Sequence, residues 1–375
     1  MAILLLILRF VAHLSKRPRK QNTIIILGSG GHTTEMFKFL DTVPEINSKF
    51  FPRHYVIADT DKGSEAKVHQ FEHNKASKQA THYHLHRIPR SREVGQSYLT
   101  SVFTTLRATL TSFRLVWSLR PDVVLANGPG TCVPICISAW LLKLLGRLPH
   151  CYIALSESYA CVSHVSLTTK LLYPFVNVLF VQWSNLLKKY PKAVYSGRIP
   201  FSPVTRKVDV NEDKGQVLVT VGTTLFKDLI KTVDSEKFGN LLNHLGYKEI
   251  HIQYGSGPMP SNIQKSKIKC VVYDYKPSLS EEISASSLII GHAGVGTIFE
   301  ALEEGKFIIA VPNPILMNNH QAEIAKEMEK RGYIKTSTCA TLYEDLKKTT
   351  SKTALKFPKT ESPAWYTTLS LALRL

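Results

Sequence analysis

Several short glycine-rich segments in the sequence stand between a predicted strand and a predicted helix. The sharpest is Gly291–Thr297, which follows the apolar run Leu288–Ile290. Glycine lets backbone N–H groups approach a diphosphate closely, and the N-terminus of the following helix adds a positive dipole. Glu300 lies one turn into that helix and could accept hydrogen bonds from the hydroxyl groups of a ribose. This segment therefore predicts a site for a nucleoside diphosphate.

Polar residues elsewhere in the same half of the chain complete this predicted site. Asn318-Asn319-His320-Gln321 opens the next predicted helix, and its amides and imidazole suit a neutral, hydroxyl-rich sugar. Gly222-Thr223-Thr224 follows another predicted strand and offers hydroxyl and amide groups near the same sheet edge. We expect these groups to bind the sugar that the diphosphate carries.

The first half of the chain has a comparable loop, Leu27–Thr33, which also follows a strand and opens a helix. It places His32 at the carboxyl edge of a sheet, where ligands bind in such folds. The alternative is that His32 only hydrogen-bonds a loop from the helix N-terminus. The loop is not a dinucleotide fingerprint, because Thr33 replaces a glycine and Asp59 comes 31 residues after Gly28. We therefore disfavour a nicotinamide or flavin cofactor.

Two further segments fall at the same predicted edge. Gly128 and Gly130, followed by Thr131, form a second glycine turn between a strand and a helix, although a plain connecting turn explains them as well. Glu157 comes directly after a strand and could orient an acceptor or act as an acid or base. Helix capping explains a carboxylate at that position equally.

The sequence gives little support for a metal site, because no His or Cys spacing resembles one. We therefore expect neither a bound metal nor another cofactor. Loop N–H groups and helix dipoles would then stabilise the leaving diphosphate.

Alternating strands and helices must position these loops. The predicted strands of the first half are Ile24–Leu27, Tyr55–Ala58, His82–Ile88, Asp122–Ala126, Tyr152–Leu155, Val178–Val181 and Ala193–Tyr195. Those of the second half are Gln216–Val221, Lys248–Gln253, Lys269–Tyr273, Leu288–Ile290 and Phe307–Val311. The predicted helices between and after them include Phe226–Leu245, Gly294–Glu304 and Ala364–Leu373. This alternation predicts an α/β protein with two parallel, doubly wound sheets.

A chain of 375 residues is long enough for two such domains. The segment Pro200–Gly215 lacks apolar periodicity and mixes Pro, Asp, Asn and Lys, so it predicts a linker. We expect an N-terminal segment at 1–20, a first domain at 21–205, a linker at 206–215 and a second domain at 216–375.

The net charge of +18 is concentrated in the first half. Residues 1–205 carry 25 Lys+Arg and 10 Asp+Glu, whereas residues 206–375 carry 22 and 19. Such a basic half suggests a polyanionic partner, which is either nucleic acid or an anionic membrane surface.

The N-terminus favours the membrane. Ile3–Leu14 is almost wholly apolar and is followed by the basic cluster Lys16–Lys20. This pattern predicts a short helix that lies in one leaflet or barely spans the bilayer, with the rest of the chain in the cytosol. A buried N-terminal helix of a soluble protein is the alternative. The six cysteines form no CxxC, which fits a reduced compartment.

Taken together, these motifs resemble a known family, the two-subunit UDP-N-acetylglucosamine transferase of the dolichol-linked (asparagine-linked glycosylation) pathway. Residues 1–205 resemble its membrane-anchor subunit, through Gly28–Thr33, Gly128–Pro134, Glu157–Ala160, Val162–His164 and Val181–Trp183. Residues 215–375 resemble its catalytic subunit, through Val219–Thr224, Gln253–Gly255, Gly291–Gly296 and Asn319–Gln321. Both halves are fused here, in the order of the related bacterial glycosyltransferase that forms lipid II.

The resemblance implies a GT-B fold, in which two Rossmann-like domains face a cleft. It implies an inverting β-1,4 transfer of GlcNAc from UDP-GlcNAc to GlcNAc-diphosphodolichol at the endoplasmic reticulum membrane, on its cytosolic face. The expected partners are these two substrates and the membrane, with no nucleic acid and no separate subunit. One departure is Phe307, which stands where the family tends to have proline and implies a packing change.

The resemblance also assigns residues to each substrate. The expected donor-binding residues are Gly222, Thr223, Gln253, Tyr254, His292, Gly294, Val295, Gly296, Thr297, Glu300, Asn319, His320 and Gln321. The expected acceptor-binding residues are Gly30, Gly31, Gly128, Gly130 and Thr131. His32 is the first choice of catalytic base, because an ordinary pKa of about 6.5 suits proton removal near neutral pH, and Glu157 is the second.

Other functions stay open at this point. A soluble UDP-sugar epimerase would share the two domains but would need no apolar N-terminus, and another lipid-diphosphate-sugar glycosyltransferase would share both. A nucleic-acid-binding protein would place aromatic residues among its basic ones along a face, whereas here the Lys and Arg are scattered and cluster beside the apolar N-terminus. A non-catalytic scaffold is a further alternative.

Overall fold

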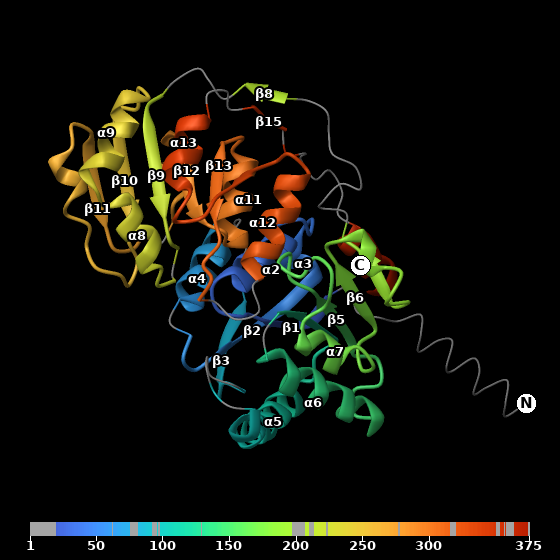
Figure 1. Ribbon diagram of the computed structural model, residues 1–375. Helices are drawn as coiled ribbons and strands as arrows, with labels where there is room; N and C mark the ends of the chain where they lie inside the picture. The colour runs from blue at the N-terminus through green and yellow to red at the C-terminus, as the bar shows by residue number, and fades with distance from the viewer. Residues whose placement is uncertain are drawn as a thin grey trace, which may run out of the picture. The chain divides into compact units, whose positions relative to one another are not determined.

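The computed structural model describes residues 20–373 (Figure 1). The gaps within this range are 62, 76–81, 92–95, 97, 129, 197–206, 210–213, 223, 277, 316–319, 350–352, 356 and 358–363. The predicted membrane segment therefore lies, except for Lys20, outside the described residues, and so does most of the predicted linker. The described residues form two compact units, one of 20–158, 163–196 and the last helix, the other of 159–162 and 207–357.

The first unit is built on a seven-stranded parallel sheet with strand order β3-β2-β1-β4-β5-β6-β7. Its strands are β1 (Gln21–Ile26), β2 (Phe50–Ala58), β3 (Tyr83–Ile88), β4 (Val123–Asn127), β5 (Tyr152–Ser156), β6 (Val178–Val181) and β7 (Ala193–Tyr195). All seven coincide with strands predicted from the sequence, most of them from apolar runs and β3 from the alternating pattern of His82–Ile88. The order reverses between β1 and β4, and the carboxyl ends of strands at such a reversal are where ligands bind in doubly wound sheets.

Helices connect these strands, as parallel pairing requires. They are α2 (Gly31–Asp41), α3 (Ile46–Lys49), α4 (Ser64–Lys75), α5 (Tyr98–Leu119), α6 (Cys132–Leu144), α7 (Leu167–Leu172) and the short η1 (Ser184–Leu186). Helix α2 follows β1 and helix α6 follows β4, so their N-termini lie at the reversal point.

The second unit repeats the scheme with a six-stranded parallel sheet of order β11-β10-β9-β12-β13-β14. Its strands are β9 (Gln216–Thr220), β10 (Glu249–Gln253), β11 (Lys269–Tyr273), β12 (Ser286–His292), β13 (Ile308–Val311) and β14 (Lys335–Thr336). Here the order reverses between β9 and β12. A separate antiparallel pair joins β8 (Lys207–Asp209) to β15 (Thr353–Leu355).

The helices of this unit are α8 (Lys227–Val233), α9 (Glu236–His244), η2 (Ile263–Lys265), α10 (Ser280–Ala285), α11 (Val295–Glu303), α12 (His320–Lys330) and α13 (Leu342–Lys348). The prediction of one helix over Phe226–Leu245 was wrong, because the chain breaks into α8 and α9. Ser235 starts α9, its Oγ accepting a hydrogen bond from the N–H of Phe238 at 3.2 Å. The carboxylate of Asp234, which lies between α8 and α9, accepts a hydrogen bond from the backbone N–H of Ile263 at 2.9 Å and so fixes the connection between the two helices. Phe307 is buried in the apolar core of this unit.

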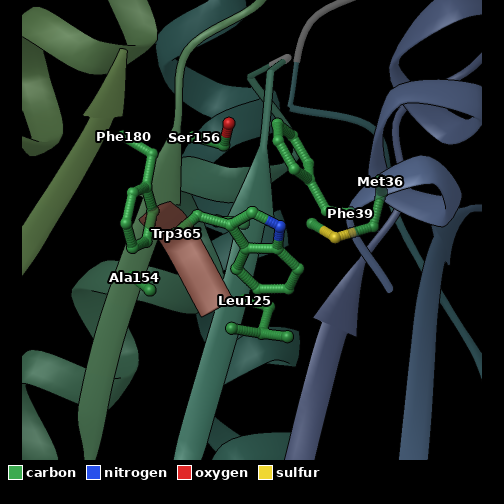
Figure 2. Close-up of a pocket in the computed structure, with 8 residues that line it drawn as sticks. Met36, Phe39, Leu125, Ala154, Ser156, Phe180 and Trp365 are labelled. Carbon is green, nitrogen blue, oxygen red and sulfur yellow. The ribbon is translucent and has the colours of Figure 1, made fainter. Parts of the chain in front are cut away.

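The last helix, α14 (Ala364–Leu373), packs on the first unit, although its place in the sequence predicted it within the second domain. Figure 2 shows the indole of Trp365 lying between side chains of α2 and the strands β5 and β6. Its ring meets Phe39 edge-on at 5.4 Å and Phe180 at 6.1 Å between centroids. Its Nε1 donates a hydrogen bond to Thr42 Oγ1 at 3.1 Å. A cavity of about 20 Å³ remains beside it, so the indole nearly fills this gap in the core.

Within the residues that the structure describes, no helix combines the length and apolar character that crossing a bilayer demands.

The packing of α14 leads to a stability prediction. Replacing Trp365 by Ala removes the indole from the core, and we expect the first unit to lose about 3–5 kcal/mol of unfolding free energy. Urea unfolding followed by circular dichroism measures the change. Leu371→Ala on the same helix is the matched control, because Leu371 is 77% exposed and should cost no more than about 0.5 kcal/mol. Equal stability of the two variants would mean that α14 does not contribute to the core.

Candidate active site

His32 is the second residue of α2 and lies at the point where the first sheet reverses. Its side chain is 33% exposed, while its Nδ1 atom is buried and has no hydrogen-bond partner among the described residues. The loop before it is braced by Thr33, whose Oγ1 donates to the carbonyl oxygen of Gly28 and lies 2.7 Å from Ser64 Oγ. Because Nδ1 is buried, Nε2 is the ring nitrogen left for a substrate.

A buried carboxylate that sequence reasoning missed lies beside this ring. Glu35 Oε2 is 3.7 Å from His32 Nδ1, one turn along α2. Asn127, at the end of β4, donates from Nδ2 to Glu35 Oε2 at 3.1 Å. Ser158, just after β5, donates from Oγ to Glu35 Oε1 at 2.9 Å. One carboxylate thus ties α2 to the ends of two strands.

The absence of a side chain at Gly128 leaves room for the His32 imidazole. A Cβ at position 128 would lie 2.2 Å from His32 Nδ1, so any side chain there would displace the ring. The backbone of Gly128 has φ of +90°, which also favours glycine. The predicted second glycine turn therefore serves as the surface against which His32 rests.

The pKa of His32 reflects opposing effects. Burial of the ring lowers the pKa of His32, whereas the carboxylates of Glu35 and, to a smaller extent, Glu157 raise it. The net effect is a pKa above the ordinary value of histidine. Asn127 also supports the charged ring. The group is thus a stronger base than a free histidine.

The other predicted acceptor residues fall into two classes. Gly30 and Gly31 have open space where a Cβ would be, and no side chain caps the first turn of α2, which contains no acidic residue. The backbone N–H groups of this first turn can therefore face an anion. Gly130 and Thr131 directly precede α6. The carbonyl of Gly130 accepts a hydrogen bond from the N–H of Val133, and Thr131 is the buried N-cap residue.

Glu157 is engaged in holding a loop. It is 1% exposed, and its two oxygens accept from the backbone N–H groups of Ser158 at 2.9 Å and Ser166 at 2.7 Å. Ser166 caps α7 in turn. Both carboxylate oxygens of Glu157 are thus engaged by backbone N–H groups, which favours His32 over Glu157 as the candidate for the catalytic base.

In the second unit, α11 begins directly after β12 and presents an uncapped N-terminus at the point of strand reversal. The N-cap residue is Gly294, so no side chain caps the helix, and the first turn has no acidic residue. Residues 294–297 are partly exposed. Glu300 folds back along the helix, so that its Oε1 would lie 3.9 Å from a Cβ at Gly296. The predicted diphosphate loop and the predicted ribose carboxylate are thus brought together.

The His292 ring packs against two glycines, Gly222 and Gly294, at positions where a side chain would overlap it. A Cβ at Gly222 would lie 2.6 Å from its Cε1, and one at Gly294 would lie 2.3 Å from its Nε2. Burial lowers the pKa of His292 to about 4, while a backbone contact with Thr220 opposes this shift. The ring is therefore neutral at pH 7 and can act through a neutral N–H group.

Three other predicted donor residues brace the loops around α11 and α12. Gln253 is buried, and its Oε1 accepts from Thr220 Oγ1 at 2.6 Å. Tyr254 is half-buried and packs on the core. Gln321 accepts from the N–H of Asn313 at 2.9 Å, and Asn313 donates to the carbonyl of Leu225 at 3.0 Å, joining two loops. Thr223, Asn319 and the side chain of His320 lie outside the described residues.

Asp59-Thr60-Asp61 has the Asp-x-Asp spacing of metal-dependent sugar transferases. The Asp61 carboxylate is buried and accepts from Gly63 N, Ser64 N and Ser64 Oγ, which makes it the cap of α4. Among the described residues, no group of three His, Cys, Asp or Glu side chains is arranged to hold a metal ion.

Comparison with known proteins matches the two halves separately. Residues 23–199 match the family described as "Oligosaccharide biosynthesis protein Alg14 like", and residues 216–367 match the "Glycosyltransferase family 28 C-terminal domain". The crystal structure of MurG from Acinetobacter baumannii superposes with a TM-score of 0.57 at 19% identity, over 88% of this chain and 89% of that one. This likeness shows the fold, a GT-B arrangement of two Rossmann-like domains.

Sequence relatives carry the assignment further. The UDP-N-acetylglucosamine transferase subunit ALG14 of Rattus norvegicus is 47% identical over 203 residues, which cover 52% of this chain and 92% of that protein. The subunit ALG13 of Homo sapiens is 42% identical over 127 residues, which cover 34% of this chain but only 11% of that protein. The predicted resemblance is confirmed: the chain belongs to the Alg14 family and carries a glycosyltransferase family 28 C-terminal domain on the same polypeptide.

Proposed function

We propose that this chain transfers GlcNAc from UDP-GlcNAc to GlcNAc-diphosphodolichol, with inversion, forming a β-1,4 linkage without a separate subunit. The observation that carries the proposal is the presence, in one polypeptide, of an Alg14-family unit and a glycosyltransferase family 28 domain. The relatives of both units are named as subunits of one UDP-N-acetylglucosamine transferase. Each unit also has a glycine-started, uncapped helix at the reversal point of its sheet.

The reaction needs one proton transfer and one displacement. The 4-hydroxyl oxygen of the acceptor bonds to the anomeric carbon of the donor sugar while the bond from that carbon to the UDP oxygen breaks. The hydroxyl proton passes to Nε2 of His32, since Nδ1 is buried, and UDP leaves with the electron pair. Glu35 holds Nδ1 on the opposite side and stabilises the imidazolium that forms.

The leaving UDP is stabilised by the second unit. The N–H groups of Gly294–Thr297 and the α11 dipole face the diphosphate, whose negative charge grows as the bond breaks. Glu300 accepts from the ribose hydroxyls, and neutral His292 donates without adding a charge of its own. Asn319, His320 and Gln321 contact the sugar. No step calls for a metal ion or other cofactor.

We place the enzyme at the endoplasmic reticulum membrane, with both units on the cytosolic side. The support is the membership of the Alg14 family, the apolar segment Ile3–Leu14 and the basic cluster that follows it. All six cysteines are free thiols, which agrees with a reducing compartment.

The single purified chain should transfer radiolabelled GlcNAc from UDP-GlcNAc to a GlcNAc-diphosphate lipid without added protein. His32→Ala should lower turnover by about 10²–10⁴-fold, because the base is lost, and leave UDP affinity unchanged. His69→Ala, a change at an exposed histidine on α4, is the matched control and should retain full turnover. Absence of transfer by the unmodified chain would refute the proposed function, whereas near-normal turnover of His32→Ala would refute only the base.

Glu35→Gln should move the acidic limb of the pH profile. The base must be neutral, so kcat/KM rises as pH increases through the pKa of His32. Glu35 raises that pKa, and removing its charge lets the pKa fall, which shifts the rise to lower pH. Measurement of log kcat/KM from pH 5 to 9 tests this. An unmoved limb, or a shift to higher pH, would separate Glu35 from the base.

Glu300→Ala should weaken UDP binding by about tenfold or more, the effect of losing hydrogen bonds to a charged group. Isothermal titration calorimetry with UDP measures it. Glu304→Ala, one turn further along at an exposed position, removes the same charge and should leave the affinity unchanged. If both variants bind UDP like the unmodified chain, the ribose assignment of Glu300 is wrong.

A further inference from the structure

The chain between β5 and α7 leaves the first unit and then returns to it. Ser158 belongs to the first unit, where its hydroxyl donates to Glu35 at 2.9 Å. The next four residues, Tyr159–Val162, belong to the second unit, and the chain is back in the first unit at Ser163. Three of these four residues are no more than 8% exposed. A short segment from the first half of the sequence is therefore buried as part of the second unit.

Tyr159 packs on the helix α11. Its ring lies on Phe299, with 4.6 Å between the ring centroids and 56° between the ring planes. Phe299 is on the buried face of α11. Two more buried rings continue the cluster, since Phe299 meets Phe357 edge-on at 5.4 Å and Phe357 meets Tyr333 at 5.2 Å. Tyr159 and Tyr333 thus stand at the two ends of a row of four aromatic rings.

The packing of Phe299 bears on the anion site because both belong to the same short helix. Residues 294–297 at the N-terminus of α11 are partly exposed. Glu300, which directly follows Phe299, folds back toward Gly296. A helix moves as one body, so a shift at Phe299 displaces the N–H groups and the Glu300 carboxylate together. Binding constellations must be held to within about 0.5 Å of their productive geometry. The contact on Phe299 therefore controls how well α11 is placed to bind a diphosphate.

Glu157 closes the loop that carries Tyr159. One of its carboxylate oxygens accepts from the N–H of Ser158 at 2.9 Å, and the other accepts from the N–H of Ser166 at 2.7 Å. A single side chain thus joins the two ends of the loop 158–166. The carbonyl oxygen of Glu157 in turn accepts from Gln182 Nε2 at 3.1 Å. Hydrogen bonds from backbone N–H groups to a carboxylate are stronger than those between neutral groups, so the loop is firmly held at its base.

The side chains of this segment act through other residues, since Glu157 and Tyr159 are both buried. Ser158 bonds to Glu35, the carboxylate beside the candidate base. Tyr159 packs on Phe299, in the helix that faces the diphosphate in the proposed reaction. Two consecutive residues therefore support the sites of two different substrates.

We propose that Tyr159 is a positioning residue of the UDP site, and that the loop 158–166, closed by Glu157, keeps its ring on Phe299. A residue from the acceptor-binding half of the sequence thereby determines how tightly the chain binds its donor. The role of α11 in UDP binding rests on the proposed function, whereas the packing of Tyr159 on Phe299 does not.

Binding of UDP to the full chain, measured by isothermal titration calorimetry, tests the positioning role. Tyr159→Ala should raise the Kd for UDP about fivefold or more, the effect of losing one ordinary hydrogen bond. Tyr159→Phe keeps the ring and should bind UDP like the unmodified chain. Tyr333→Ala is the matched control, because it removes the same buried side chain from the other end of the row of rings and should leave the Kd unchanged. Tyr159→Leu and Tyr333→Leu, which leave smaller cavities, form the same pair if the alanine variants do not fold.

Steady-state kinetics separate positioning from general damage. In Tyr159→Ala the KM for UDP-GlcNAc should rise with the Kd for UDP. The KM for a GlcNAc-diphosphate lipid and the acidic limb of the pH profile should stay unchanged, because Ser158 still holds Glu35. Ser158→Ala, one residue earlier, should leave the Kd for UDP unchanged.

Glu157→Gln tests the closure of the loop. The substitution replaces one accepting oxygen by an NH₂ group, which cannot accept from a backbone N–H group. The loop should open, and the Kd for UDP should rise as it does in Tyr159→Ala. A carboxylate that acted only as an acid or base on the acceptor would not affect UDP binding.

The outcomes distinguish this proposal from the proposed function. An unchanged Kd for UDP in Tyr159→Ala, or an equal rise in Tyr333→Ala, would overturn the positioning role, and so would an unchanged Kd in Glu157→Gln. An unmodified chain that binds UDP but transfers no GlcNAc would refute the proposed function, while the calorimetry would still decide the role of Tyr159. An unmodified chain that binds no UDP would refute both.

Discussion

The buried carboxylate of Glu35 is the interaction on which the site of the first unit depends. A charge removed from water must be compensated, and here Asn127, Ser158 and His32 supply the compensation. Each comes from a different segment, so satisfying one charge fixes the end of β4, the end of β5 and the first turn of α2 at once. The imidazole is thereby held in place by groups that are themselves buried.

The two units use the same backbone device with opposite electrostatic results. In each, a histidine at the sheet reversal rests on a glycine with positive φ, Gly128 under His32 and Gly222 under His292. In the first unit a carboxylate stands next to the ring and raises its pKa, which suits a group that takes up a proton. In the second unit burial lowers the pKa to about 4, which suits a permanently neutral donor beside a diphosphate.

The seven strands of the first sheet, all strands of the second except β14, the glycine loops and the two-domain α/β architecture were predictable from the sequence, because short apolar runs followed by turn residues leave a local signal. The short strands β8, β14 and β15 have no such signal and were not predicted. Glu35 was not, because a Glu three residues after His32 looks like any helical surface residue until Asn127 and Ser158, 92 and 123 positions away, are seen beside it. The role of Glu157 left no signal either, although its partners Ser158 and Ser166 are only one and nine positions away, because their backbone N–H groups meet the carboxylate only in the folded loop. The break before α9 did leave a local signal, since Asp234-Ser235 is a capping sequence inside an otherwise helical pattern.

The return of α14 to the first unit has a consequence for how the protein is made. Roughly 170 residues, which include nearly all of the second unit, are translated between β7 and Trp365. At about 5–20 residues per second, the ribosome needs on the order of 10–30 seconds to supply the indole after the seventh strand has emerged. Until then Phe39 and Phe180 lack the indole that packs on both of them in the folded unit. The first unit is the earlier one to be synthesised, and yet it receives this core side chain only after the second unit has been made.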